Sequence, residues 1–203
     1  MFEVPLFPTQ LFVFKHEDPI IDEEVDNIPD DPDILSHLSE GAKEEIVYGS
    51  HTGMENLQLF DKYNLPHLRK FCERSLAHID PVCTITQSWL NRGKKDSFQI
   101  AHTHAGFSLS GVYYNHCCLP EQGGIIFLNP NPHSKMCHWG TEEGRHFPAT
   151  PRTLLIFPSW LEHKTDKNRI DTPRVSIAFN AKCPLRTGSI IPRRKRNVTL
   201  NHK

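Results

Sequence analysis

The sequence has no long hydrophobic run and almost no net charge. No apolar stretch approaches the roughly 20 residues that cross a bilayer, and no apolar segment at the N-terminus resembles a signal peptide. The formal net charge is −1 at pH 7, so overall charge points to no particular class of partner. These features predict a protein of the cytoplasm without a membrane-spanning segment.

The cysteines show no pairing pattern. Six are present, and no two of them form a CxxC motif. An oxidised disulfide framework therefore has little support, and we expect the cysteines to be reduced. The six are Cys72, Cys83, Cys117, Cys118, Cys137 and Cys183.

The length allows one well-filled domain over residues 1–203. Within it we expect an N-terminal strand and helical support over 1–80, a jelly-roll core over 81–185 and a basic tail over 186–203. The tail contains the basic run Arg193–Arg196. A short terminal cluster of this kind is more often solvated than bound to nucleic acid, so nucleic acid is not an expected partner.

We expect an edge strand and supporting helices in the N-terminal part, and mainly short β-strands in the rest of the chain. Prolines and partly alternating apolar residues over 4–14 predict an extended edge strand, and the acidic segment 17–33 predicts a solvated connection with room for a short helical turn. Apolar residues spaced by three and four over 56–80 predict an amphipathic helix that begins near Leu65. Short β-rich runs follow, which is typical of a mainly β (α+β) jelly roll. They are Cys83–Leu90, Phe98–Ala101, Phe107–Tyr114, Gly124–Leu128, Thr153–Phe157 and Arg174–Asn180.

Three histidines have the spacing of a metal site. His102 and His104 lie between two strand-like runs, and residues i and i+2 of an extended chain point to the same side, so both imidazoles can face one ion. His163 follows the apolar strand 153–157 by a few residues. Such a set would be facial and would leave the other positions of an octahedral ion open. The HxH pair alone is a weak signal, because the chain has thirteen histidines.

Arg174 opens a hydrophobic strand and shares one strand face with Ser176. An unpaired guanidinium on the inner wall of a barrel would be costly, so it needs an anion. A planar guanidinium suits a carboxylate, and a hydroxyl two residues later adds a second contact to the same group. The pattern predicts an anion site; the alternative is that Arg174 reaches solvent or the nearby Asp171.

Five short motifs resemble those of one enzyme superfamily in their order and spacing. The sequence contains HTH at 102–104, SGVYY at 110–114, GG at 123–124, FPSWLEH at 157–163 and RVSIAFN at 174–180. Together they resemble the Fe(II)- and 2-oxoglutarate-dependent dioxygenase superfamily over residues 83–182, and in particular a phage and bacterial group of 2OG-Fe(II) oxygenases. More distantly they are similar to prolyl hydroxylases.

The resemblance implies a double-stranded β-helix, that is, a cupin-like jelly roll with supporting N-terminal helices. It also implies bound Fe(II), 2-oxoglutarate as co-substrate and O2. His102, His104 and His163 become the implied iron ligands. Most of the superfamily has a carboxylate where this chain has His104, so the alternative is that only one histidine of the pair binds iron and that Asp96 or a water completes the shell.

The resemblance further implies that Arg174 and Ser176 hold the far carboxylate of 2-oxoglutarate. In prolyl hydroxylases a tyrosine near the first metal motif contacts the same co-substrate, and Tyr114 is similar to it in position. Tyr113 and Tyr114 lie on opposite faces of one strand, so only one of them need take part.

The implied function is hydroxylation of a substrate C–H bond, coupled to the decarboxylation of 2-oxoglutarate to succinate. The substrate can be a prolyl or other protein side chain, a small molecule or a nucleobase, and residues 129–147 are the candidate substrate loop. If the protein is viral, its compartment is the host cytoplasm. Two alternatives stay open: a three-histidine oxygenase that does not use 2-oxoglutarate, and a non-catalytic β-sandwich that binds a partner.

Overall fold

The computed structural model describes residues 8–29, 50–51, 58–131 and 143–184. The predicted basic tail, the first residues of the N-terminal extended segment and the middle of the candidate substrate loop lie outside these ranges. No helix in the described ranges is long and apolar enough to cross a bilayer.

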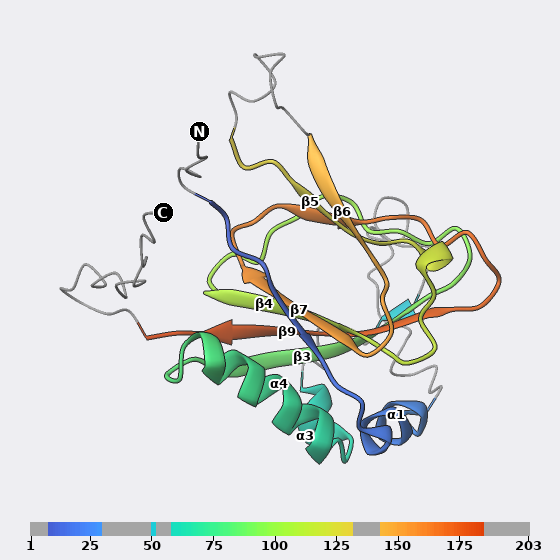
Figure 1. Ribbon diagram of the computed structural model, residues 1–203, viewed down its shortest axis with the longest axis horizontal. Helices are drawn as coiled ribbons and strands as arrows, with labels where there is room; N and C mark the ends of the chain where they lie inside the picture. Colours follow the sequence, from blue (N-terminus) through green and yellow to red (C-terminus); the bar gives the residue numbers. More distant parts are fainter. Residues whose placement is uncertain (1–7, 30–49, 52–57, 132–142, 185–203) are drawn as a thin grey trace, which may run out of the picture.

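Two antiparallel β-sheets face each other across the molecule, which confirms the predicted mainly β jelly roll (Figure 1). The larger sheet has the strand order β1-β7-β4-β9-β3-β2, and the smaller sheet has the order β6-β5-β8. The larger sheet consists of β1 (Phe12–Lys15), β2 (Ser50–His51), β3 (Thr84–Gly93), β4 (Leu109–Tyr114), β7 (Thr153–Pro158) and β9 (Arg174–Lys182). The smaller one consists of β5 (Gly124–Leu128), β6 (Gly144–Pro148) and β8 (His163–Thr165), and the 3-10 helix η3 (Pro120–Gln122) precedes β5.

Three helices lie against the outer face of the larger sheet: α1 (Pro19–Asp26), α3 (Leu59–Lys62) and α4 (Pro66–Ile79) (Figure 1). The predicted amphipathic helix is confirmed as α4, which has proline in its first turn. Its buried residues Leu68, Cys72 and Leu76 follow one another at four-residue spacing and so form one face. That face packs on the sheet.

The N-terminus of α4 is held by α1. Glu24 of α1 accepts hydrogen bonds from the backbone N–H groups of His67 and Leu68, each at 2.9 Å. A carboxylate at this end of a helix satisfies otherwise unpaired donors and interacts favourably with the helix dipole. The two helices are thereby fixed to each other.

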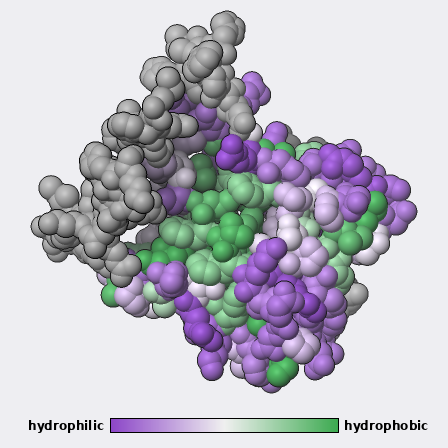
Figure 2. All heavy atoms as spheres, in the orientation of Figure 1, coloured by the Kyte–Doolittle hydropathy of each residue, from purple (hydrophilic) through white to green (hydrophobic). Residues whose placement is uncertain are grey.

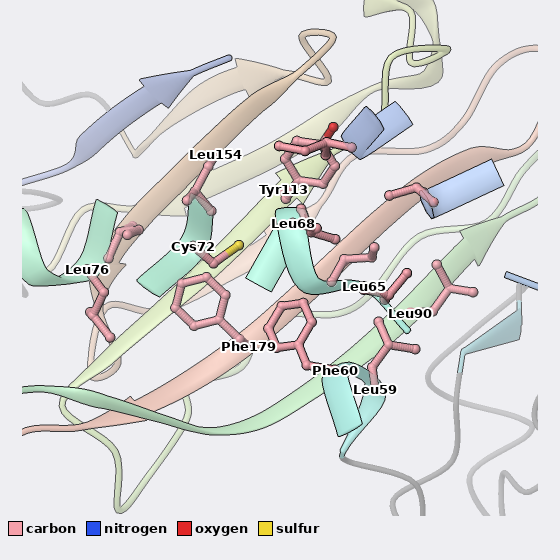
Figure 3. Packing of buried hydrophobic residues seen from close by; sticks show 14 of the residues in the cluster. Leu59, Phe60, Leu65, Leu68, Cys72, Leu76, Leu90, Tyr113, Leu154 and Phe179 are labelled. Atoms are coloured by element: carbon pink, nitrogen blue, oxygen red, sulfur yellow. The ribbon is translucent and has the colours of Figure 1, made fainter. Parts of the chain in front are cut away.

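Alternate residues of the larger sheet point to two different cores. Tyr113 and Phe179 point outward, toward the helices, and the ring of Phe179 occupies the space that a side chain at Gly111 would need. Figure 3 shows this outer core, in which Tyr113 and Phe179 meet residues from α3 and α4. Tyr114 and Phe157 instead point inward, between the two sheets. Figure 2 shows hydrophobic residues gathered in the middle of the face viewed, over the space between the sheets of Figure 1.

Two expectations about local structure are wrong. The acidic segment 17–33 carries a complete helix, α1, because Asp18 caps it and Ile21 and Val25 bury its apolar face. Residues 98–101 do not form a strand. There, the Gln99 N–H donates to the side-chain hydroxyl of Thr165 at 2.7 Å, and this bond takes the place of a regular ladder bond.

No pattern in the sequence predicted the strands β6 and β8. The candidate substrate loop 129–147 ends inside β6, which pairs with β5 from Leu128↔Gly144 to Gly124↔Pro148. β8 pairs with the other side of β5. Both strands are short and irregular in pattern, so alternation could not identify them.

One disulfide bond contradicts the expectation of reduced cysteines. Cys83 and Cys183 are bonded to each other, 100 residues apart in the sequence. Thr84 of β3 is paired with Lys182 of β9, so the residues just outside this pair lie opposite each other. Sequence spacing carries no information on such a pair, because the pairing of the strands alone brings the two cysteines together.

Candidate metal centre and anion pocket

Backbone pairing brings His102 and His163 together. The two residues form an isolated antiparallel bridge, in which the His102 N–H donates to His163 O at 2.9 Å and the His163 N–H donates to His102 O at 3.0 Å. His104 is tied to the same part of the chain, because its N–H donates to Ser159 O at 2.9 Å. The HxH segment is thus attached along the connection from β7 to β8.

The three imidazoles converge. One ring nitrogen of each of His102, His104 and His163 lies within 4.8 Å of the others. The Nε2 atoms of His104 and His163 are 3.3 Å apart. Two nitrogens bound to one ion at a right angle, with bonds of about 2.1 Å, lie about 3 Å apart, so the separation fits a shared ion.

Two of the rings are oriented by backbone carbonyls. His102 Nδ1 lies 2.8 Å from Ile100 O, and His163 Nδ1 lies 2.8 Å from Leu161 O. A carbonyl oxygen can only accept, so each Nδ1 carries the hydrogen and each Nε2 presents its lone pair. This arrangement is typical of metal-binding histidines.

Burial keeps two of the imidazoles neutral. Burial, and to a smaller extent the neighbouring His102, lower the pKa of His104 to about 4. Burial lowers the pKa of His163 to about 3, although its hydrogen bond to Leu161 acts in the opposite direction. The rings of Phe127 and Phe157 pack around His163, with centroids 6.1 and 4.8 Å from its own. Both histidines are therefore in the form that binds a metal at neutral pH.

Asp96 is not part of this group. Its side chain is 65% exposed, and its carboxylate lies 3.4 Å from Lys167 Nζ. Within the described ranges the cluster of possible ligands at this place consists of the three histidines alone. The structure thus brings together the three-histidine set rather than the alternative with an acid.

Arg174 is buried at the start of β9 and faces the same cavity as the histidines. Its Nη1 donates to Gln122 O at 2.6 Å and to Asp166 O at 2.9 Å. Among the described residues no carboxylate forms an ion pair with it, including Asp171, which pairs with Lys95 at 3.1 Å. Nε and Nη2 are left to form a planar fork, which is the shape that binds a carboxylate through two hydrogen bonds.

The other two predicted contacts lie beside Arg174. Tyr114 of β4 is paired with Ser176 of β9, so the two side chains are neighbours on the inner face. Both are buried and both line the cavity. Burial raises the pKa of Tyr114 well above its usual value, so its hydroxyl keeps its proton and is a hydrogen-bond donor. Tyr113 faces the other side, where its hydroxyl lies 2.8 Å from His16 Nε2.

Sequence reasoning missed two polar residues of this cavity. Ser97 is 2% exposed, and its Oγ has no hydrogen-bond partner among the described residues; the same is true of Asn91 Oδ1. Asn91 is paired with Ser176, and a Cβ added at Gly93 would lie 2.7 Å from Ser97 Oγ and 3.6 Å from Arg174 Nη2. The glycine thus allows the hydroxyl and the guanidinium to lie close together. Neither residue belongs to a recognisable motif, and only the register of β3 against β9 could have indicated Asn91.

The cavity itself has a volume of about 90 Å³. One water needs roughly 10–15 Å³ of such volume, so the cavity has room for a small molecule. Buried polar atoms without a partner cost free energy, and two of the three such atoms in the described ranges lie here, beside a guanidinium that no carboxylate of those ranges pairs with. The residues present therefore fit a small dicarboxylate next to a metal ion.

A family model described as "Putative 2OG-Fe(II) oxygenase" matches residues 87–180. The matched range contains all three histidines of the cluster, as well as Tyr114, Arg174 and Ser176. No curated protein sequence matches the chain. The phage and bacterial group that the motifs resemble stays a prediction.

Solved structures of 2-oxoglutarate oxygenases have a similar fold. HygX from Streptomyces hygroscopicus, solved with nickel, 2-oxoglutarate and hygromycin B bound, is similar with a TM-score of 0.58 and 12% identity, over 87% of this chain and 84% of that chain. A prolyl hydroxylase from Trichoplax adhaerens, in complex with a peptide fragment of the hypoxia inducible factor oxygen degradation domain, gives 0.60 and 13%, over 85% and 83%. At these identities the likeness shows the jelly-roll fold alone.

A third similar structure is an oxidoreductase of the 2OG-Fe(II) oxygenase family from Burkholderia pseudomallei, with 17% identity and a TM-score of 0.46. The match covers 59% of this chain and 56% of that one, so it spans little more than half of that protein's length. The family model thus matches the part of the chain that holds the histidines and Arg174, and the solved structures share the fold.

Proposed function

We propose that the chain is an Fe(II)- and 2-oxoglutarate-dependent dioxygenase that hydroxylates a C–H bond of its substrate. His102, His104 and His163 are the proposed iron ligands, and Arg174 is the proposed anchor for 2-oxoglutarate. The observation that carries the proposal is one cavity that combines three converging imidazoles with a buried arginine that has no carboxylate partner among the described residues.

When bound, Fe(II) and 2-oxoglutarate supply the activation of dioxygen: 2-oxoglutarate loses CO2, one oxygen atom enters the succinate that is formed, and the other enters the substrate as a hydroxyl group. The protein orients these groups and excludes water. Arg174 offers Nε–H and Nη2–H to the far carboxylate, and the hydroxyl groups of Tyr114 and Ser176 donate beside it. The ring of Trp89 lies 5.8 Å from that of His104.

Three neutral imidazoles change the charge of the site. A ligand set with one carboxylate would cancel one positive charge of Fe(II), whereas this set cancels none. We expect weaker iron binding than with a carboxylate and stronger attraction of the doubly negative 2-oxoglutarate to the loaded site. Iron and 2-oxoglutarate should therefore bind with positive coupling.

Exposed apolar side chains close to the histidines suggest where the substrate binds. Phe98, Ile100 and Trp160 are 39%, 43% and 58% exposed, and each lies two to four residues before His102 or His163. Phe98 also lines the cavity. We propose that these side chains contact an apolar part of the substrate, which is either a peptidyl side chain or a small molecule. Apolar groups of this kind at the edge of a site are typical of recognition surfaces.

Succinate formation tests the proposal. The iron-loaded chain should convert 2-oxoglutarate to succinate and CO2 slowly without substrate, and His163→Ala should abolish this turnover. A screen of peptides and small apolar molecules should then identify compounds that accelerate succinate release. Absence of any turnover in the iron-loaded chain would contradict the proposed function.

A further inference from the structure

The described residues contain a second group of side chains that could bind a metal ion, separate from the three histidines. Asp26 is the last residue of α1, and His116 and Cys117 lie in the connection from β4 to η3. One ligand atom from each of the three lies within 4.8 Å of the others. In Figure 1, α1 is located next to the end of β4 at which this connection begins.

Hydrogen bonds direct His116 toward Asp26. The amide of the buried Asn115 has a fixed orientation, because its Nδ2 donates to Asp26 Oδ1 at 3.2 Å and to Cys117 Sγ at 3.4 Å. Its Oδ1 therefore accepts, and His116 Nδ1, 2.9 Å away, carries the hydrogen. The lone pair of His116 Nε2 is left to face Asp26 Oδ2 at 3.5 Å.

A lone pair and a carboxylate oxygen at this distance repel each other unless a cation lies between them. That cation is either a proton on His116 or a metal ion. The nearest other acid does not need one, because Asp22 is already neutralised by Arg152, whose Nη2 and Nε donate to its Oδ2 at 2.7 and 2.9 Å. Cys117, the residue after His116, places a third possible ligand atom within 4.8 Å, and this completes a donor set that a metal ion can use and a shared proton does not.

The donor set indicates the class of ion. One oxygen, one nitrogen and one sulfur atom form the mixed set that zinc accepts in tetrahedral sites, with a fourth position for water. The N–H of Asn115 points at Cys117 Sγ and orients it. Burial and the nearby carboxylate of Asp26 raise the pKa of the Cys117 thiol, so a metal ion must displace its proton to bind the thiolate. A partner that orients the imidazole through Nδ1 is also typical of zinc sites.

We propose that Asp26, His116 and Cys117 form a second metal site, for Zn²⁺ or a similar ion, that ties the end of α1 to the connection after β4. The site is independent of the proposed oxygenase chemistry. It would hold the helical layer to the sheet at the point where Asn115 already connects the two.

Cobalt distinguishes the two sites, because only the second contains sulfur. The full-length chain, freed of metal and kept under argon, is titrated with Co²⁺ while the near-ultraviolet absorption of cobalt–thiolate bonds is recorded. We expect this absorption in the wild type and in the variant that carries His102→Ala, His104→Ala and His163→Ala. We expect it to disappear in Cys117→Ser and in His116→Ala, together with one equivalent of bound cobalt.

Two controls make the result decisive. His67→Ala, whose imidazole pairs with Glu24, should retain the absorption. Zn²⁺ should raise the melting temperature of the variant without the three histidines but not that of the same variant with Cys117→Ser added. Absence of cobalt–thiolate absorption in the wild type, or its persistence in Cys117→Ser, would overturn the proposal.

Discussion

His102 and His163 are joined by a β-bridge in which each backbone N–H donates to the carbonyl oxygen of the other, at 2.9 and 3.0 Å. Two proposed iron ligands from distant parts of the chain therefore have a fixed separation that does not depend on a bound ion. Preorganised ligands lose little conformational entropy when an ion binds. We therefore expect the site to form in the metal-free protein.

The first prediction concerns the most buried ligand. His163→Ala should abolish stoichiometric Fe(II) binding, because the remaining two imidazoles cannot form a facial set. Iron bound per chain is measured after anaerobic equilibrium dialysis. His67→Ala removes an imidazole on the helical side and should bind iron as the wild type does. Unchanged iron binding by His163→Ala would exclude this residue as a ligand.

The second prediction separates the two possible ligand sets. His104→Ala should lower the affinity for Fe(II) by more than the roughly 10- to 100-fold typical of a lost outer-shell partner. Asp96→Ala should leave the affinity unchanged, because the carboxylate lies next to Lys167 and is exposed. The dissociation constants of both variants are compared anaerobically. The reverse order of the two effects would favour the set that includes an acid.

The third prediction concerns the unpartnered hydroxyl in the cavity. Ser97→Ala should weaken 2-oxoglutarate binding by about 10- to 100-fold, the equivalent of one hydrogen bond of roughly 1.5–3 kcal/mol to a charged group. The same change should not destabilise the metal-free protein, because Ser97 Oγ forms no hydrogen bond with any residue that the structure describes. Isothermal titration and thermal unfolding measure the two effects.

Ser88→Ala is the matched control for Ser97→Ala. Ser88 is also buried, but its Oγ accepts a hydrogen bond from the Phe60 N–H at 3.2 Å, on the helical side of the sheet. This variant should unfold at a lower temperature and bind 2-oxoglutarate normally. If Ser97→Ala behaves in the same way, its hydroxyl has a structural role only.

The fourth prediction is a pH dependence of stability. His104 and His163 have folded pKa values of about 4 and about 3, below the usual value of 6.5. Between these values the unfolded chain binds more protons than the folded one, so the metal-free protein should lose stability as the pH falls from 6.5 toward 4. Each histidine contributes an upper limit of about 1.4 kcal/mol per pH unit.

Urea unfolding at several pH values checks this dependence. The variant with His104→Gln and His163→Gln has no such titration and should show a shallower decline over the same range. Equal slopes for the variant and the wild type would show that the two histidines are protonated as easily in the folded chain as in the unfolded one.

The sequence predicted those parts of the fold that local pattern determines. The spacing of apolar residues placed α4, which is buried on one face, and continuous β-rich runs placed the long strands of the larger sheet, which are buried on both faces. The short strands β6 and β8 are stabilised mainly by their pairing with β5, which no local pattern encodes. The Cys83–Cys183 bond depends on strand pairing in the same way.

The residues of the candidate site likewise fall into those that a local sequence pattern could identify and those that it could not. His102, His104 and Arg174 could be selected because their spacing relative to strands has a chemical meaning, and the structure places them at one cavity. Ser97 and Asn91 could not, because a single serine in a turn and a single asparagine in a strand have no distinctive pattern. Their importance follows only from the lack of hydrogen-bond partners for Ser97 Oγ and Asn91 Oδ1 within the part of the chain that the structure describes.

The central claim is that Fe(II) and 2-oxoglutarate bind together in the cavity between the histidines and Arg174. The most direct measurement is the visible absorption of the anaerobic Fe(II)-loaded chain on addition of 2-oxoglutarate. We predict a metal-to-ligand charge-transfer band in the wild type. In Arg174→Lys, which loses the planar fork, the band should require at least about 30-fold more 2-oxoglutarate, given a loss of roughly 2 kcal/mol or more. A wild-type chain that binds Fe(II) but shows no such band would contradict the account.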